Sequence, residues 1–211
     1  MYLTDVDLRK AIESGKLICD PLPESIEATS IDLHLDSVDG AMIWNVDRYI
    51  DDQKGTGSAR PELRIRDFKL GPFSAQYLTS PPPFTAHSNA LVQRRGDEVI
   101  VRTGGFLLWQ TKEKVGTPTD DAELICFVDG KSTRARAGIV VHLTAPTIHS
   151  SWAGQITLEI ANLGPFDLVL QEDDVVAQLT VARVSCPPQR TMAMTSQTFQ
   201  QASVGGHRKA K

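Results

Sequence analysis

The chain has 211 residues, and its 22 Lys and Arg against 26 Asp and Glu give a formal net charge of -4. Hydrophobic residues make up 41% and charged residues 23%, ordinary proportions for a globular protein, which exclude disorder as the main state. No apolar run approaches the roughly 18 residues of a membrane span, so we expect no membrane association. The slight acidity argues against a nucleic-acid-binding surface.

The cysteines and the two chain ends give the first organisational expectations. Cys19, Cys126 and Cys186 are an odd number and lie far apart, which indicates no disulfide framework and favours a cytoplasmic protein. The amino end carries no secretory signal pattern. We expect one domain over residues 1–188 and a mobile polar tail over 189–211 that is a candidate active-site lid.

A short helix is predicted close to the amino end. Thr4 suits the N-cap, Asp7 stands at the third helical position, and Leu3 and Leu8 fit a hydrophobic staple. Gly15 is the expected stop. The alternation of apolar and polar side chains in residues 30–35 then predicts a strand.

Residues 51–88 are expected to form an irregular surface excursion, because they are rich in turn formers and contain three consecutive prolines at 81–83. One strand is expected there, over residues 63–68. From residue 89 onward, short apolar runs alternate with turn signals, which predicts a mainly β barrel or jelly roll. The expected strands cover residues 90–93, 98–102, 106–111, 124–128, 138–144, 155–161, 168–170 and 175–184.

The segment Gly130-Lys131-Ser132 is similar to a phosphate-binding loop of nucleotide hydrolases, but Ile125 stands where that loop needs glycine, so we reject that assignment. The segment still follows a predicted strand and is expected to open a short helix whose free N–H groups attract phosphate. Ser132 and Arg136 would share one face of it. A solvated turn with ordinary surface charges explains the segment about equally well.

Four further polar residues have ordinary explanations when each is taken alone. Glu159 falls on the polar face of a half-buried strand, where carboxylates are usually solvated. His142 and His149 have no neighbouring Cys or carboxylate at metal-ligand spacing, so no metal site is expected. Gln178 lies inside an apolar run and needs a partner, because an unpaired buried amide costs about 1–3 kcal/mol.

Together these segments resemble the deoxycytidine triphosphate deaminase family of the trimeric deoxyuridine triphosphatase superfamily. Residues 130–138 resemble its Gly-Arg-Ser-Ser-Leu-Ala-Arg-x-Gly motif, and His142-Leu143-Thr144-Ala145 resembles the next block. The strand around Glu159 is similar to the one that carries the family's catalytic glutamate. Residues 174–179 resemble a late superfamily motif, and residues 30–35 an early one.

The resemblance implies a distorted β-barrel or jelly roll that assembles as a homotrimer with active sites at subunit interfaces. The reaction would be dCTP plus water giving dUTP plus ammonia. Glu159 would be the general base and proton shuttle, and Ala145 would act through its backbone beside the attacking water. The residues implied in substrate binding are Lys131, Ser132, Thr133, Arg136, Thr144, Ala145 and Gln178.

The resemblance also implies that Mg²⁺ bridges the triphosphate and does not activate the water. The zinc-dependent solution to deamination needs a His-x-Glu and a Pro-Cys-x-x-Cys signature. Neither occurs here, because Cys186 is followed by Pro187-Pro188-Gln189 and no His-x-Glu exists. We therefore expect a zinc-free deaminase.

Two departures from the family pattern leave alternatives open. His149 stands where the superfamily usually has an aspartate that helps to activate water against phosphate, which favours deamination alone. In the tail, Phe199 and Gln201 loosely resemble the family's Lys-Tyr-x-x-Gln lid. A diphosphatase acting on dUTP or a modified deoxynucleotide, and a non-catalytic nucleotide-binding trimer, remain the alternatives.

Overall fold

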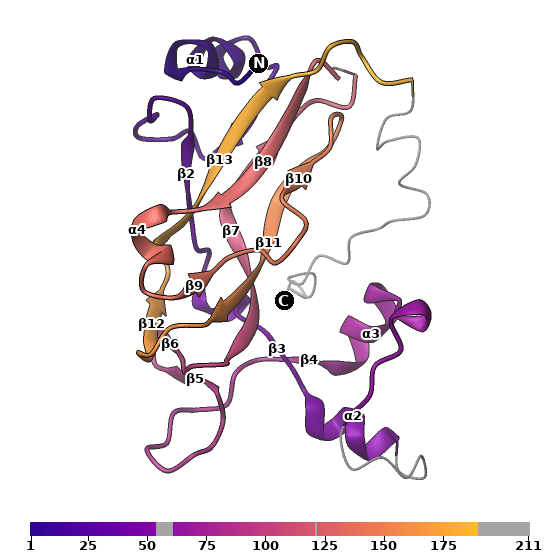
Figure 1. The fold of residues 1–211 in the computed structure, drawn as a ribbon, viewed down its shortest axis with the longest axis vertical. Helices are drawn as coiled ribbons and strands as arrows, with labels where there is room; N and C mark the ends of the chain where they lie inside the picture. Colours follow the sequence, from indigo (N-terminus) through magenta and orange to yellow (C-terminus); the bar gives the residue numbers. More distant parts are fainter. Residues whose placement is uncertain (54–60, 121, 190–211) are drawn as a thin grey trace, which may run out of the picture.

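Two four-stranded antiparallel sheets form the centre of the computed structural model, which describes residues 1–53, 61–120 and 122–189 (Figure 1). The first sheet has the order β1 (Ile18–Asp20), β7 (Phe106–Gly116), β11 (Ala153–Asn162), β9 (Ile139–Val140). The second has the order β10 (Thr147–Ile148), β8 (Leu124–Gly130), β13 (Val175–Arg183), β2 (Ile31–His34). A third sheet, ordered β12 (Leu168–Gln171), β6 (Glu98–Val101), β5 (Val92–Arg95), extends one end.

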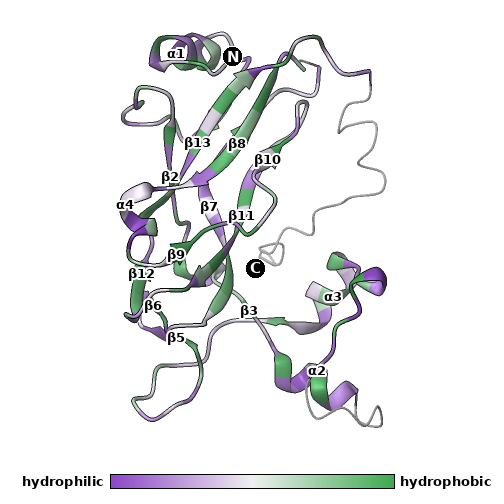
Figure 2. Cartoon of the chain, in the orientation of Figure 1, coloured by the Kyte–Doolittle hydropathy of each residue, from purple (hydrophilic) through white to green (hydrophobic). Residues whose placement is uncertain are grey.

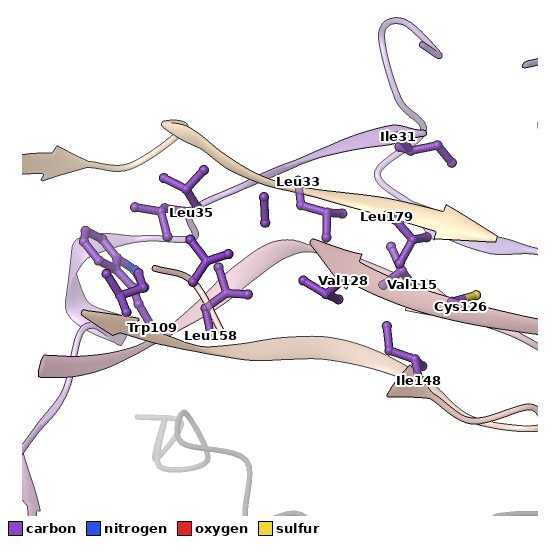
Figure 3. Packing of buried hydrophobic residues seen from close by; sticks show 14 of the residues in the cluster. Ile31, Leu33, Leu35, Trp109, Val115, Cys126, Val128, Ile148, Leu158 and Leu179 are labelled. Carbon is purple, nitrogen blue, oxygen red and sulfur yellow. The ribbon is translucent and has the colours of Figure 1, made fainter. Parts of the chain in front are cut away.

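The core lies between the two larger sheets, where alternate residues of each strand point inward. Leu33, Val128 and Leu179 come from one sheet, and Trp109 and Leu158 come from the other (Figure 3). The Trp109 indole N–H donates to the carbonyls of Asp36 and Ser37, at 3.0 and 3.1 Å, so this large buried ring keeps its polar group satisfied. The predicted mainly β fold is confirmed, with sheets packed face to face as in a distorted jelly roll.

The predicted amino-terminal helix is confirmed as α1 (Asp5–Glu13), with Thr4 at its N-cap. Leu3 and Leu8 are both buried in the core, as the hydrophobic staple requires. Asp7 accepts a hydrogen bond from the Thr4 hydroxyl at 3.3 Å, and the Asp5 N–H is taken by the Ala28 carbonyl instead. Gly15 follows the helix with a φ of +72°, which explains its suitability as the stop.

Each strand range predicted after residue 89 contains a strand, although residues 138–144 are extended only at β9 and β10 was not predicted. The strand expected over residues 63–68 is wrong, because the 3₁₀ turn η2 (Ile65–Asp67) lies there. The excursion also contains the unpredicted helix α3 (Leu70–Tyr77). Its Gly71 and Pro72 fall in the first turn, where proline is tolerated. Because both residue types are also typical of turns, the sequence pattern did not predict this helix.

We use the name lobe for residues 43–53 and 61–79, which project from the sandwich and contain β3 (Ile43–Trp44), α2 (Val46–Asp52), η2, α3 and β4 (Leu78–Thr79) (Figure 1). β3 and β4 pair with each other, and Met42 bridges to Leu108 of β7. Phe73 is the centre of an aromatic cluster, with ring centroids at 4.7 to 5.7 Å from those of Trp44, Tyr49, Phe68 and Tyr77. The lobe therefore has a small apolar centre of its own.

Two short helical segments complete the described fold. The turn η1 (Val38–Gly40) follows β2, and α4 (Ser132–Ala135) follows β8. In Figure 2, α4 is mixed in hydropathy, with pale, purple and green parts, and lies beside the green, hydrophobic strand β9. None of the helices in the described ranges is long and apolar enough to cross a membrane.

Candidate active site

Glu159 lies on the outer face of β11, and its neighbours in the strand explain why. Leu158 and Ile160 are buried between the sheets, so the alternation of the strand turns Glu159 and Thr157 away from the core, as predicted. Glu159 is half-buried because chain from other elements covers this face. Its partner in the ladder is Leu108 of β7, which is buried and also forms a backbone bridge with Met42.

The chain after β9 holds the Glu159 carboxylate in a fixed position. The Leu143 N–H donates to Glu159 Oε2 at 3.1 Å, and the Glu159 N–H donates to the Val141 carbonyl at 3.1 Å. Among the described residues, the structure gives Oε1 no hydrogen bond. One carboxylate oxygen is therefore oriented by the backbone, while the other can accept a proton from a bound water.

A pocket of about 850 Å³ opens beside this carboxylate. The rest of the lining is mainly apolar, and the polar groups on the wall come from Glu159, Thr157, Thr147, Thr144, His142 and His149. The apolar lining residues are Trp44, Leu63, Ile65, Phe68, Leu70, Phe106, Leu108, Val128, Leu143, Ala145, Pro146, Ile148, Trp152, Ile156 and Leu158. An apolar wall beside one oriented carboxylate offers a surface for an aromatic base next to a proton acceptor, which suits proton transfer.

Thr144 and Ala145 lie in the loop between β9 and β10, beside Glu159 on the pocket wall. His149 follows β10 and also lines the pocket with an exposed side chain. His142 is half-buried, with its Nε2 4.0 Å from the Asp129 carboxylate, and its buried Nδ1 has no hydrogen-bond partner within the described residues. The structure thus brings Glu159, Thr144, Ala145 and His149 together.

The other predicted binding residues lie on a different part of the chain. Ser132 and Thr133 are exposed in α4, and Arg136 is its exposed C-cap, so the helix-opening expectation for this segment is confirmed. None of these three lines the pocket, and α4 lies at the left edge of Figure 1 whereas the lobe lies at the lower right. Lys131, the N-cap of α4, is not a pocket residue either.

Gln178 is half-buried in β13, opposite Asp32 of β2 and Asp129 of β8. Its Oε1 accepts a hydrogen bond from the Ser30 hydroxyl at 3.4 Å, which supplies the partner expected for an amide within an apolar run of sequence. Gln178 does not line the pocket. Phe199 and Gln201, the two tail residues, lie outside the residues that the structure describes.

The lobe residues on the pocket wall were missed by the sequence reasoning. Leu63, Ile65, Phe68 and Leu70 come from the excursion, to which no function was assigned. Ile65 is 76% exposed, so it is not a core residue. The close spacing of these four large apolar residues in a turn-rich stretch was the available signal for an apolar binding surface.

The described residues contain no group of three His, Cys, Asp or Glu side chains close enough to hold a metal ion. Cys19 and Cys126 are buried free thiols, and burial raises the pKa of each to about 12, so they are poor metal ligands and poor nucleophiles. Cys186 is exposed.

Comparisons with known proteins bear on this geometry. The family model described as dCTP deaminase-like matches residues 2–184. The dCTP deaminase of Natronomonas pharaonis is 30% identical over 193 residues, which cover 90% of this chain and 84% of that protein. The dCTP deaminase, dUMP-forming, of Thermobifida fusca is 31% identical over 189 residues, covering 89% and 80%.

Among solved structures, the 2'-deoxycytidine 5'-triphosphate deaminase from Agrobacterium tumefaciens superposes with a TM-score of 0.53 at 17% identity. The match covers 87% of this chain and 48% of that one, so this chain spans about half the length of that protein. At this identity the likeness shows a shared fold.

Proposed function

Because this chain belongs to the dCTP deaminase-like family, we propose that it hydrolyses the 4-amino group of dCTP, giving dUTP and ammonia. The observation that supports this most directly is the half-buried Glu159 carboxylate, held by the Leu143 N–H at the wall of an apolar pocket. Deamination without a zinc-activated water needs one such group, because a single carboxylate can move every proton that the reaction requires.

In the proposed mechanism, cytosine enters the pocket with its C4 facing Glu159. The carboxylate takes a proton from a water as the water oxygen bonds to C4, and the proton passes to ring N3. A second proton from the added hydroxyl is carried by Glu159 to the amino group, the C4–N bond breaks, and ammonia leaves. General acid–base catalysis of this kind contributes about 10²–10⁴ in rate.

The separation of the pocket from α4 supports a shared site in a homotrimer. In one chain, Ser132, Thr133 and Arg136 lie outside the pocket that holds Glu159, yet a deoxynucleoside triphosphate needs both a base pocket and cationic phosphate ligands. We propose that α4 of one subunit completes the Glu159 pocket of the next. Gln178 would also contact the nucleotide in this shared site.

The triphosphate would carry Mg²⁺ into the site as part of the substrate, since phosphate oxygens supply the ligands that this ion prefers. We expect a reaction on free deoxynucleotides of this kind to take place in the cytoplasm. The tail residues Phe199 and Gln201 stay candidate lid residues within this proposal.

The direct test incubates the protein with dCTP and Mg²⁺ and follows ammonia and dUTP, with dUMP monitored as the product of a second hydrolysis. Glu159→Gln should lose at least about a hundredfold in kcat because the amide cannot accept the proton. The matched control is Glu13→Gln at the end of α1, which should keep full activity. Unchanged turnover in Glu159→Gln, or no product from folded wild-type trimer, would contradict the proposal.

A further inference from the structure

The Lys131 side chain has a partner inside its own chain. Lys131 Nζ lies 2.5 Å from Asp32 Oδ1, and the two side chains are only 22% and 26% exposed. Lys16 and Glu123 form another lysine ion pair, at 2.7 Å, but with side chains 43% and 49% exposed. The Lys131 pair is therefore shielded from solvent more than a typical surface pair, and its attraction is screened less.

The backbone of Lys131 is also fixed. Its N–H donates to the Val176 carbonyl at 3.3 Å, and its carbonyl accepts the Ala135 N–H at 2.9 Å, which closes the first turn of α4. Val176 is the extra residue at the irregularity in the pairing of β13 with β2, between Val175 and Ala177. Lys131 thus joins α4 to the β13 bulge through its backbone.

The ion pair spans the second sheet at this point. β13 lies between β8, which ends just before Lys131, and β2, which carries Asp32. Gln178 of β13 stands opposite both Asp32 and Asp129. The Lys131 side chain therefore extends from the end of β8 across β13 to Asp32 of β2. The contact ties the start of α4 to a strand that is two positions away in the sheet.

The remaining cations of the turn are differently placed. Arg134 and Arg136 are both exposed, and within the described residues the structure gives neither an acidic partner. A guanidinium without a carboxylate partner keeps its donors for a phosphate, and its fork matches phosphate oxygens better than an ammonium does.

We infer that Lys131 is a positioning residue that acts through Asp32, and that Arg134 joins Arg136 in binding the nucleotide phosphates. The inference rests on the proposed function, since it concerns the phosphate end of the same site. It assigns Lys131 a different role from the direct phosphate contact that the sequence resemblance implied. Arg134, which replaces an apolar residue of the family motif, becomes the second phosphate ligand.

Asp32→Asn distinguishes a positioning role of Lys131 from direct phosphate binding by whether it raises KM for dCTP. If Lys131 positions α4, loss of the carboxylate loosens the turn and raises KM about tenfold, while kcat stays within about twofold because Glu159 is untouched. If Lys131 binds phosphate directly, removing its competing carboxylate leaves KM unchanged or lowers it, which would overturn the inference.

A double-mutant cycle gives the second readout. Lys131→Met should raise KM as much as Asp32→Asn, and the double variant should raise it no further. The reversed pair, Asp32→Lys with Lys131→Asp, should restore KM toward the wild-type value. Additive effects of the two substitutions on KM would overturn the positioning role. A reversed pair with a higher KM than either single variant would also overturn it, because that result is expected if residue 131 binds phosphate directly, which a carboxylate cannot do.

Lys16→Met and Glu123→Gln are the matched control, since their ion pair lies at the opposite end of β8 and its loss should leave KM unchanged.

Arg134→Met should raise KM about tenfold while the melting temperature of the protein is retained, and an unchanged KM would overturn the assignment of Arg134 as a phosphate ligand. Wild-type protein that neither binds nor deaminates dCTP would overturn the proposed function itself, whereas active wild type with an additive cycle would overturn only the role of Lys131.

Discussion

Glu113 shows how one side chain joins the two large sheets. It lies on β7 with 4% exposure, and both of its oxygens contact His34 of β2. Oε1 lies 2.6 Å from His34 Nδ1, and Oε2 accepts the His34 N–H at 2.9 Å. The carboxylate therefore satisfies a backbone donor and an imidazole at the same time, which makes its burial tolerable.

Glu113→Ala should lower the free energy of unfolding by about 3 kcal/mol, because it leaves a backbone N–H and an imidazole nitrogen without their acceptor. Urea unfolding measures the change. Asp39→Ala is the control, since Asp39 pairs with Arg94 but its side chain is 75% exposed, and its loss should cost under about 1 kcal/mol. Equal losses in the two variants would contradict this account.

Cys126 makes stability depend on alkaline pH. Its side chain is fully buried, and burial raises the pKa of its thiol from 9.0 to about 12. Above pH 9 the unfolded chain loses this proton while the folded chain retains it, so the stabilisation present below pH 9 falls as the pH rises toward 12. The loss is about 1.4 kcal/mol per pH unit.

Comparison of wild type with Cys126→Ala by urea unfolding between about pH 8 and about pH 10.5 tests this linkage. The variant should be less stable at the lower pH, because it leaves a small cavity, but its free energy of unfolding should fall less steeply. Cys186→Ala should keep the wild-type slope, because that thiol is exposed. Parallel slopes for wild type and Cys126→Ala would rule the linkage out.

At the residue scale, strand alternation was enough to place Glu159 on the outer face and to predict a partner for Gln178. It was not enough to identify the partner of Lys131. Lys131 and Asp32 are 99 residues apart, and nothing in either local pattern links them. Such a contact depends on the order of strands in the sheet, which periodicity does not determine.

At the element scale, two glycines fix α4 against the end of β11. Gly138 has a φ of +98°, and a Cβ at this position would lie 2.2 Å from the Gly164 Cα. The Leu163 N–H donates to the Gly138 carbonyl at 2.8 Å across the same contact. No side chain fits here, so the turn that carries Arg136 is held by backbone packing.

Gly138→Ala should displace the α4 turn and therefore raise KM for dCTP as well as lower the melting temperature. Gly96→Ala separates crowding from backbone strain, because Gly96 also has a positive φ, of +65°, but nothing lies within 4 Å of the position that a methyl group would take there. It should cost only about 1–2 kcal/mol, with KM unchanged. A normal KM in Gly138→Ala would contradict this role.

Elements with a strong local pattern were predictable. The helix α1 has a cap, a staple and a glycine stop, and β7, β8, β11 and β13 have clear alternation. The lobe helices were not predictable, because α2 has no buried residues and Gly-Pro falls in the first turn of α3. These helices are stabilised by an aromatic cluster whose members come from separate segments, and no short stretch of sequence contains all of them.

At the scale of the whole molecule, the proposed shared site predicts complementation between two inactive variants. Glu159→Gln and Arg136→Met should each be inactive as homotrimers. Subunits mixed at equal amounts and allowed to exchange should recover about a quarter of wild-type activity, because that fraction of sites takes Glu159 and Arg136 from intact copies.

Sedimentation should confirm that the mixed species are trimers, and each variant mixed with itself serves as the control. Recovery would require the two residues of one site to come from different chains. No recovery despite verified exchange would place both residues in the same subunit and contradict the shared site.

The lobe has an evolutionary consequence. The rings of its aromatic cluster pack on one another, and the Met42–Leu108 bridge next to β3 links the lobe to β7 of the sandwich. Substitutions at Leu63, Ile65 or Leu70 therefore change the pocket lining without disturbing the packing between the two sheets. Under the proposed function, selection can remodel which bases the pocket admits while β11, which carries Glu159, and its supporting framework remain constant.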